Sequence, residues 1–330
     1  MKALGRGLAR AAVVFLALWA ALAIWLDGPG RRPVAAVLAA AIVGLTVAAL
    51  SRSRPFGRAL ALALVAPLAV LAWWLALRPR NDRDWQADVA RTPTAEVRGD
   101  AAVVRDVRNF DYRSETDWAE RWETRPYDLS KLQGVDLFVS HWGPTLYAHT
   151  ILSWDFAGAR PLAVSIETRK EKAESYSALR GFFRQYELAY VAADERDVVR
   201  LRTSFRGETV YLYRLTAPAE AARALLLQYL EAMNALAAEP AWYNAATQSC
   251  TTTIFRNLKV IAPRSRLDWR LLANGRLYEL AYEQGRVDTS LPLAELRARS
   301  DITARAKACA GREDFSSCIR EGLPWPAGRR

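Results

Sequence analysis

The chain has 330 residues, of which 52% are hydrophobic, and a formal net charge of +11. The average composition is that of a globular protein, but the apolar residues are concentrated in the first quarter, so the two parts are read separately. The positive charge does not indicate a nucleic-acid-binding protein, because the arginines flank apolar segments or alternate with acidic residues and form no basic stripe.

The first 80 residues contain three apolar runs without charged residues inside them. Their lengths are close to the roughly 20 residues that a helix needs to cross a bilayer. They predict transmembrane helices at about 8–26, 33–50 and 59–78. A signal peptide is the alternative for the first run, but two further apolar runs follow at once. We therefore interpret residues 1–80 as a membrane region.

The basic residues of the short loops predict how this region is oriented. Positive charge is retained on the cytoplasmic side of a membrane. Basic residues precede the first run (Lys2, Arg6, Arg10) and lie between the second and third runs (Arg52, Arg54, Arg58), whereas Arg31 and Arg32 of the first loop are offset by Asp27. We expect a multi-pass protein of inner-membrane type, with everything after about residue 80 in the periplasm or otherwise outside the cytoplasm.

The remainder of the chain predicts one α+β domain of about 230 residues. A polar stretch, 81–100, is interpreted as a linker. Runs rich in β-formers follow at 101–112, 135–143, 146–156, 160–170, 186–193, 197–205 and 208–215, with a part-helical stretch between the first two. Apolar spacing then predicts a helix over 218–238 and a second helix from about residue 248. Residues 263–330 are expected to form mixed helices and loops.

The three cysteines divide into a pair and a single residue. Cys309 and Cys318 enclose a short polar loop, which in an oxidising compartment predicts a disulfide. A zinc site would need further ligands, and the chain has only two histidines, His141 and His149, so no metal is expected. Cys250 is left as a free thiol.

Cys250 lies in YNAATQSCTTTIFRN, at the start of the second predicted helix. The first turn of a helix stabilises a thiolate, which favours a nucleophile. The alternative is a small buried hydrophobic residue, as most free cysteines are. The polar neighbours favour the first interpretation but leave the second open. Asn244 could donate to an oxyanion or cap the helix.

A cysteine nucleophile needs a base, and histidine is its usual partner. We favour His149, expected in the middle of a strand, over His141 at a strand end. On the neighbouring strand, Ser165 and Glu167 share one face and could orient the imidazole. The alternative for Glu167 is an ion pair with Arg169 or another arginine.

Four segments resemble one family: VRNFDYRSETDW, GVDLFVSHWGPTLYAHTILSWDF, VSIETRKEKAESYSALRGFFRQYELAYVAADERDVVRLRT and WYNAATQSCTTTIFRN. Together they are similar to the Lnb-type periplasmic domain of bacterial membrane proteins, linked to lipoprotein N-acylation. The resemblance covers roughly residues 100–262. It implies a permuted papain-like (NlpC-type) cysteine domain over 101–262, with His149 as base and Cys250 as nucleophile, followed by a C-terminal extension, 263–330.

The resemblance also implies a reaction. The thiolate would take an acyl chain from a phospholipid donor as a thioester and pass it to the α-amino group of a diacylglyceryl lipoprotein, without a cofactor. Partners would be the membrane, the phospholipid and the lipoprotein acceptor. The residues alone also allow a cysteine hydrolase acting on peptides or peptidoglycan, or a non-catalytic envelope scaffold.

Overall fold

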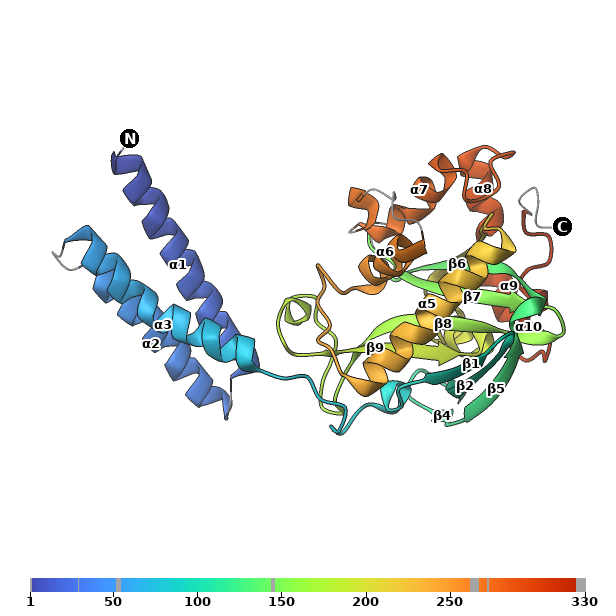
Figure 1. Cartoon of the computed structure of the whole chain (residues 1–330), viewed down its shortest axis with the longest axis horizontal. Helices are drawn as coiled ribbons and strands as arrows, with labels where there is room; N and C mark the ends of the chain where they lie inside the picture. The colour runs from blue at the N-terminus through green and yellow to red at the C-terminus, as the bar shows by residue number, and fades with distance from the viewer. Residues whose placement is uncertain are drawn as a thin grey trace. The chain divides into compact units, whose positions relative to one another are not determined.

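A computed structural model describes residues 2–28, 30–51, 55–143, 146–261, 267–271 and 273–324. The chain divides into two compact units. We call Met1–Arg80 together with Tyr176–Tyr186 the helical unit, and Asn81–Ser175 together with Glu187–Arg330 the α+β unit. Each is described separately (Figure 1).

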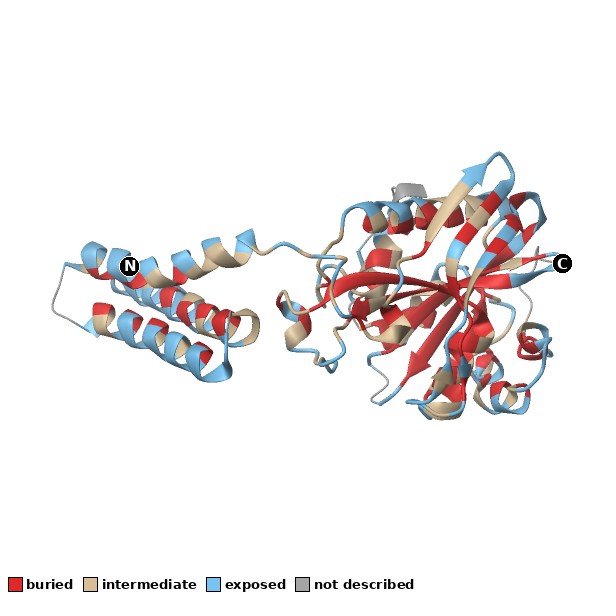
Figure 2. Cartoon of the chain, turned by 90° about the horizontal axis from the view of Figure 1, so that it is seen from below, coloured by how far each residue is buried: buried red, intermediate tan, exposed pale blue. Residues whose placement is uncertain are grey.

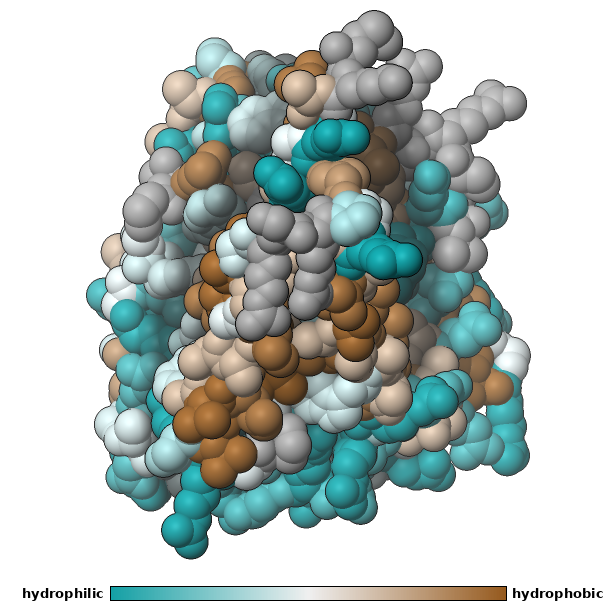
Figure 3. All heavy atoms as spheres, turned by 90° about the vertical axis from the view of Figure 1, so that its left-hand side faces the viewer, coloured by the Kyte–Doolittle hydropathy of each residue, from teal (hydrophilic) through white to brown (hydrophobic). Residues whose placement is uncertain are grey.

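The helical unit contains α1 (Lys2–Asp27), α2 (Arg32–Ser51) and α3 (Phe56–Ala76). Among the described residues, these are three helices long and apolar enough to cross a membrane, so the three predicted apolar helices are confirmed. Small residues such as Ala20 and Ala63 are buried where the helices pack. Large apolar side chains such as Phe15 point outward, and much of the end view in Figure 3 is hydrophobic.

A later segment of the chain, Tyr176–Tyr186, belongs to the helical unit. The backbone N–H of Arg184 and the side-chain amide of Gln185 donate to the carboxylate of Asp27 at 3.2 and 2.8 Å. The indole N–H of Trp74 donates to the same carboxylate at 2.6 Å. The ends of α1 and α3 are therefore joined to this segment through one acidic side chain.

A mixed sheet forms the centre of the α+β unit. Its order is β1-β2-β9-β8-β7-β6-β10, and β5 also pairs with β2; every pairing is antiparallel except the short parallel contact of β2 with β9. The strands are β1 (Thr94–Arg98), β2 (Ala101–Arg108), β5 (Trp122–Asp128), β6 (Leu132–His141), β7 (His149–Phe156), β8 (Ala159–Arg169), β9 (Glu187–Ala193) and β10 (Thr209–Arg214). A separate pair consists of β3 (Asp111–Tyr112) and β4 (Trp118–Ala119). The α+β class is confirmed.

Helices lie on both faces of this sheet. On one face α5 (Ala219–Ala238) accepts a hydrogen bond from the indole of Trp154 at the carbonyl of Ala222, 3.0 Å, and contacts α6 (Cys250–Ile261). Ile151, three residues before Trp154 on β7, faces the other way. It packs in a cluster with residues of α4 (Glu195–Arg200), α9 (Thr303–Ala308) and α10 (Phe315–Cys318). The strands between are largely buried (Figure 2).

Two predicted elements are wrong. The part-helical stretch between the first two strands instead contains β4, β5 and one 3-10 turn, Leu129–Lys131. Residues 197–205, expected as a strand, form most of α4 and the π-helical turn Leu201–Phe205. Asp194 caps this helix by accepting from the backbone N–H of Arg196 at 2.9 Å. Val198 and Val199 are buried side by side because the helix is covered on several sides.

The predicted linker is more structured than expected, whereas the extension has the expected helices, loops and disulfide and also contributes to the core. Within 81–100, Trp85 and Val89 are buried and β1 pairs with β2. Within 263–330 lie α7 (Leu277–Glu283), α8 (Leu293–Ser300), α9 and α10, and Cys309 and Cys318 form a disulfide. Ile302, Phe315 and Ile319 pack in the same core cluster as Ile151. The boundary predicted between residues 262 and 263 lies outside the described residues.

Candidate active site

Cys250 is the first residue of α6 and is partly exposed. The start of the helix is fixed by a reciprocal pair of hydrogen bonds. The N–H of Ser249 donates to the hydroxyl of Thr252 at 2.8 Å, and the N–H of Thr252 donates to the hydroxyl of Ser249 at 3.4 Å. The sulfur therefore lies in the helical turn whose free amide groups favour a negative charge.

His149 is the first residue of β7, not a mid-strand residue as predicted. Its Nε2 is 2.6 Å from the hydroxyl oxygen of Ser165 and 3.2 Å from Oε1 of Glu167, both on β8. The Ser165 hydroxyl donates to the same Oε1 at 2.6 Å, so its oxygen accepts the Nε2 proton. The structure thus places both expected orienters on one ring nitrogen, and the imidazole also interacts with the thiol of Cys250.

A further charge lies behind Glu167. The guanidinium of Arg202, from the π-helical turn after α4, donates to Oε1 of Glu167 at 3.0 Å, and its side chain is only 5% exposed. The arginine named as the alternative partner, Arg169, donates to the carbonyls of Val89 and Ala90 instead. Glu167 therefore both contacts the imidazole and forms an arginine ion pair.

These neighbours set the charges of the pair. Burial opposes ionisation of the Cys250 thiol, but hydrogen bonding and charge interaction with His149 lower its pKa to about 6. Burial likewise opposes protonation of His149, yet the carboxylate of Glu167 raises the imidazole pKa to about 9. Burial also works against the charged form of Glu167, but His149 and then Arg202 hold its pKa well below the usual value. These shifts favour a thiolate beside an imidazolium at neutral pH.

Asn274 also reaches the sulfur, and the sequence did not indicate it. It lies in the 3-10 turn Asn274–Arg276, beyond the predicted domain 101–262. Its Nδ2 is 3.4 Å from Sγ of Cys250 and 2.7 Å from the hydroxyl of Thr251, while its Oδ1 accepts from the N–H of Ala148 at 2.8 Å. No local pattern in the sequence marks this residue.

The other two polar candidates have different contacts. Oδ1 of Asn244 accepts from the backbone N–H groups of Ala246 and Thr247 at 3.0 and 3.1 Å, so it orders the turn that leads into α6. His141 ends β6, where its ring packs edge-on against Tyr211 with the ring centres 5.7 Å apart. Its pKa is lowered, first by burial and then by the charge of Arg297.

Exposed aromatic side chains lie on the segments around the site. Trp142 and Tyr147, before His149, are 56% and 58% exposed, and Trp269 is 54% exposed. The two segments are joined, because the N–H of Gly275 donates to the carbonyl of Leu146 at 3.1 Å. The two joined segments that contribute His149 and Asn274 to the site therefore also carry exposed aromatic side chains.

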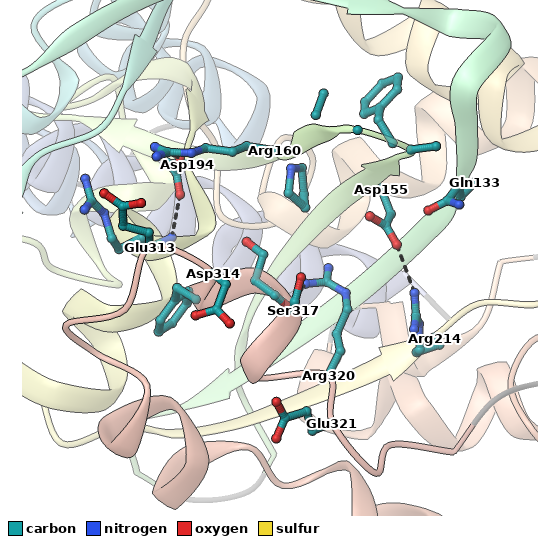
Figure 4. Close-up of a pocket in the computed structure, with 18 of the residues that line it drawn as sticks. Gln133, Asp155, Arg160, Asp194, Arg214, Glu313, Asp314, Ser317, Arg320 and Glu321 are labelled. Atoms are coloured by element: carbon teal, nitrogen blue, oxygen red, sulfur yellow. Dashed lines mark hydrogen bonds and ion pairs between the residues drawn. The ribbon is translucent and has the colours of Figure 1, made fainter.

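A polar hollow of about 880 Å³ lies elsewhere, between the β7–β8 turn and α10. Two ion pairs lie among its charges: Arg214 contacts Asp155 at 3.0 Å and Arg160 contacts Asp194 at 3.5 Å (Figure 4). None of the residues around Cys250 lines it. Among the residues that the structure describes, no three His, Cys, Asp or Glu side chains are grouped to hold a metal ion.

Residues 118–275 match the family model described as the Lnb N-terminal periplasmic domain. The chain carries an Lnb-type periplasmic domain. The match confirms the resemblance, and it runs beyond the predicted end at 262 to include Asn274. Searches of the curated proteins and of the solved structures gave no match. With the three apolar helices, the Lnb-type domain makes this a membrane protein with a periplasmic domain.

Proposed function

We propose that this protein is a thiol acyltransferase of the inner membrane, which moves an acyl chain from a phospholipid through a Cys250 thioester to the α-amino group of a diacylglyceryl lipoprotein. The proposal rests on four neighbouring side chains that alternate in charge, in the order Cys250, His149, Glu167 and Arg202, with the sulfur at a helix N-terminus. A lowered thiol pKa beside a raised imidazole pKa is the arrangement that an acyl-accepting thiolate requires.

In the first half-reaction the Cys250 thiolate adds to an ester carbonyl of the phospholipid, forming a carbon–sulfur bond and an oxyanion. When the oxyanion collapses, the ester carbon–oxygen bond breaks. His149, already protonated, donates its proton to the departing alkoxide, giving a lysophospholipid and an acyl-Cys250 thioester. Ser165 and Glu167 hold the imidazole by Nε2, and the proton transfers are assigned to the other ring nitrogen, Nδ1.

In the second half-reaction the lipoprotein α-amino group attacks the thioester. The carbon–sulfur bond breaks, an amide forms, and neutral His149 accepts the proton that the amine loses. Thiolate and imidazolium are thereby restored. No change of oxidation state occurs in either half.

The surroundings of the thiol support lipid substrates. Tryptophan and tyrosine are the side chains favoured where a protein meets a bilayer, and Trp142, Tyr147 and Trp269 are exposed on segments next to the site. The three apolar helices would hold the enzyme where both substrates reside, which raises their effective concentration. Hydrolysis shares the first half-reaction and differs only in that water replaces the amine.

The test uses cells depleted of their own lipoprotein N-acyltransferase. We expect wild type to add one acyl chain to a lipoprotein N-terminal peptide, measured by mass spectrometry, and Cys250→Ser to add none, since an alcohol in this site is not ionised. His149→Gln should reduce the product at least about 100-fold. The matched variant His141→Gln should retain it, because His141 packs on Tyr211. Equal acylation by wild type and Cys250→Ser would reject the mechanism.

The same samples separate transfer from hydrolysis. Transfer predicts an acyl group on Cys250 that neutral hydroxylamine releases, together with acylated peptide. Release of free fatty acid from the wild type, with no change in the peptide mass, would identify a hydrolase.

A further inference from the structure

Asn274 connects three parts of the site. Its Oδ1 accepts from the backbone N–H of Ala148, the residue before His149, and its Nδ2 contacts both Thr251 and the sulfur of Cys250. The residue is 7% exposed. One carboxamide therefore fixes the spacing between the strand that carries the imidazole and the helix that carries the thiol.

The contact with Ala148 also fixes which end of the carboxamide faces the sulfur. A backbone N–H can only donate, so it must meet the oxygen of the carboxamide, and the amino group is left to face the site. That amino group has two protons. One is directed to the Thr251 hydroxyl at 2.7 Å, and the second lies on the side of Sγ, 3.4 Å away.

We propose that Asn274 is a catalytic residue, whose amino group donates to the oxyanion formed when Cys250 attacks the acyl carbonyl. The inference rests on the proposed function and deepens it. The oxyanion is bonded to the carbon that Sγ attacks, so a donor in contact with Sγ is within reach of it. The Nδ2–H group that donates to the thiolate before attack donates to the oxyanion instead as the negative charge passes from sulfur to oxygen, and its proton stays on nitrogen. Donors held in place in this way lower the barrier without reorganisation.

The experiment compares two reactions of the same thiol in the full-length protein in detergent. Acylation by phospholipid, followed as hydroxylamine-labile acyl-Cys250 in a single turnover, passes through an oxyanion. Alkylation by iodoacetamide does not, because it is a displacement at a saturated carbon. We expect Asn274→Ala to slow acylation by about 100-fold or more, and to change the alkylation rate at pH 7 by less than about fivefold.

Two further variants separate donation from support. Asn274→Asp keeps an oxygen for the N–H of Ala148 but has no amino group, and we expect it to be as slow in acylation as Asn274→Ala. Asn257→Ala removes another buried carboxamide, one that donates to the Tyr190 hydroxyl at 3.3 Å, and should acylate within about threefold of wild type. Acylation of Asn274→Ala at the wild-type rate, or an equal loss of acylation and alkylation, would overturn the inference.

A failure of the proposed function is recognised separately. If wild type forms no thioester with phospholipid, the acyl donor is replaced by a p-nitrophenyl acyl ester, whose attack also gives an oxyanion. A selective loss for Asn274→Ala with this ester supports the role of Asn274 even if phospholipid is not the substrate, and no selective loss rejects it.

Discussion

The charge on Cys250 depends on side chains that do not touch it. Sulfur, imidazole, carboxylate and guanidinium follow one another from Cys250 through His149 and Glu167 to Arg202, alternating in sign. Each charge stabilises the next, and the last member is 5% exposed, so solvent screens it little. The reactivity of the Cys250 thiol therefore depends on residues of β7, β8 and the π-helical turn after α4, as well as on α6.

The pH dependence of the thiol follows from these pKa values. A thiol whose pKa is lowered to about 6 is largely thiolate at pH 7, and the ion pair persists until His149 loses its proton near pH 9. We expect iodoacetamide alkylation of wild type to rise with pH through a midpoint near 6. In His149→Gln the thiol should return toward its ordinary pKa of about 8.5, which lowers the rate at pH 7 by about 30-fold. A midpoint that is the same in both proteins would contradict the ion pair, and His141→Gln serves as the control.

Part of this site could be predicted from the sequence because its residue types are scarce. With two histidines and one unpaired cysteine, the choice of Cys250 and His149 was narrow, and strand alternation placed Ser165 and Glu167 opposite the histidine. Asn274 could not be found in this way. It is 24 residues from Cys250 in the sequence and depends on tertiary packing alone.

Helix α4 was predicted as a strand because a helix buried on several sides has a strand-like sequence pattern. Its β-branched residues, Val198 and Val199, favour a strand, yet both lie in the core against α9 and α10. A helix covered on several sides loses the amphipathic spacing by which helices are recognised. The cap at Asp194 was the remaining signal, and it precedes the helix directly. Because this segment was predicted as a strand, the position of Arg202 behind Glu167 was also missed.

Asp194 should determine the stability of this element. Besides capping α4, its carboxylate contacts the guanidinium of Arg125 at 2.7 Å in a nearly buried pair. We expect Asp194→Ala to lower the free energy of unfolding by about 3 kcal/mol, since it removes the cap and leaves Arg125 with less charge compensation. Asp194→Asn, which can still cap, should lose less. Thermal unfolding of the full-length protein in detergent measures both, and equal losses would show that the cap contributes nothing.

At the scale of the whole molecule, the core of the α+β unit joins the two ends of its sequence. One cluster contains Val89, Phe138 and Ile151 together with Phe315 and Leu323. The membrane spans were predictable because length and hydropathy are local properties. The assignment of residues 302–323 to the core was not, because short polar helices show little pattern of their own.

Arg320 should be essential for the stability of this core. Its guanidinium contacts Asp136 at 2.8 Å and Glu195 at 2.6 Å, and both carboxylates are fully buried. Arg320→Ala would remove the closest guanidinium from two buried carboxylates, of which Asp136 keeps a longer contact with Arg214 at 3.5 Å, and we expect a loss of about 3–5 kcal/mol. Arg312→Ala removes an exposed ion pair with Asp314 and should cost less than about 1 kcal/mol. Thermal unfolding of both variants tests this contrast, which comparable losses would contradict.

The position of Arg320 also bears on how the protein reaches its compartment. A periplasmic domain that follows transmembrane helices crosses the bilayer from its N-terminal end, so Asp136 and Glu195 arrive before Arg320. Until residues 302–323 have crossed, the cluster around Ile151 lacks one side, and Asp136 and Glu195 have not yet met Arg320. We therefore expect the core to close only after this last segment, which also contains the Cys309–Cys318 disulfide, has crossed.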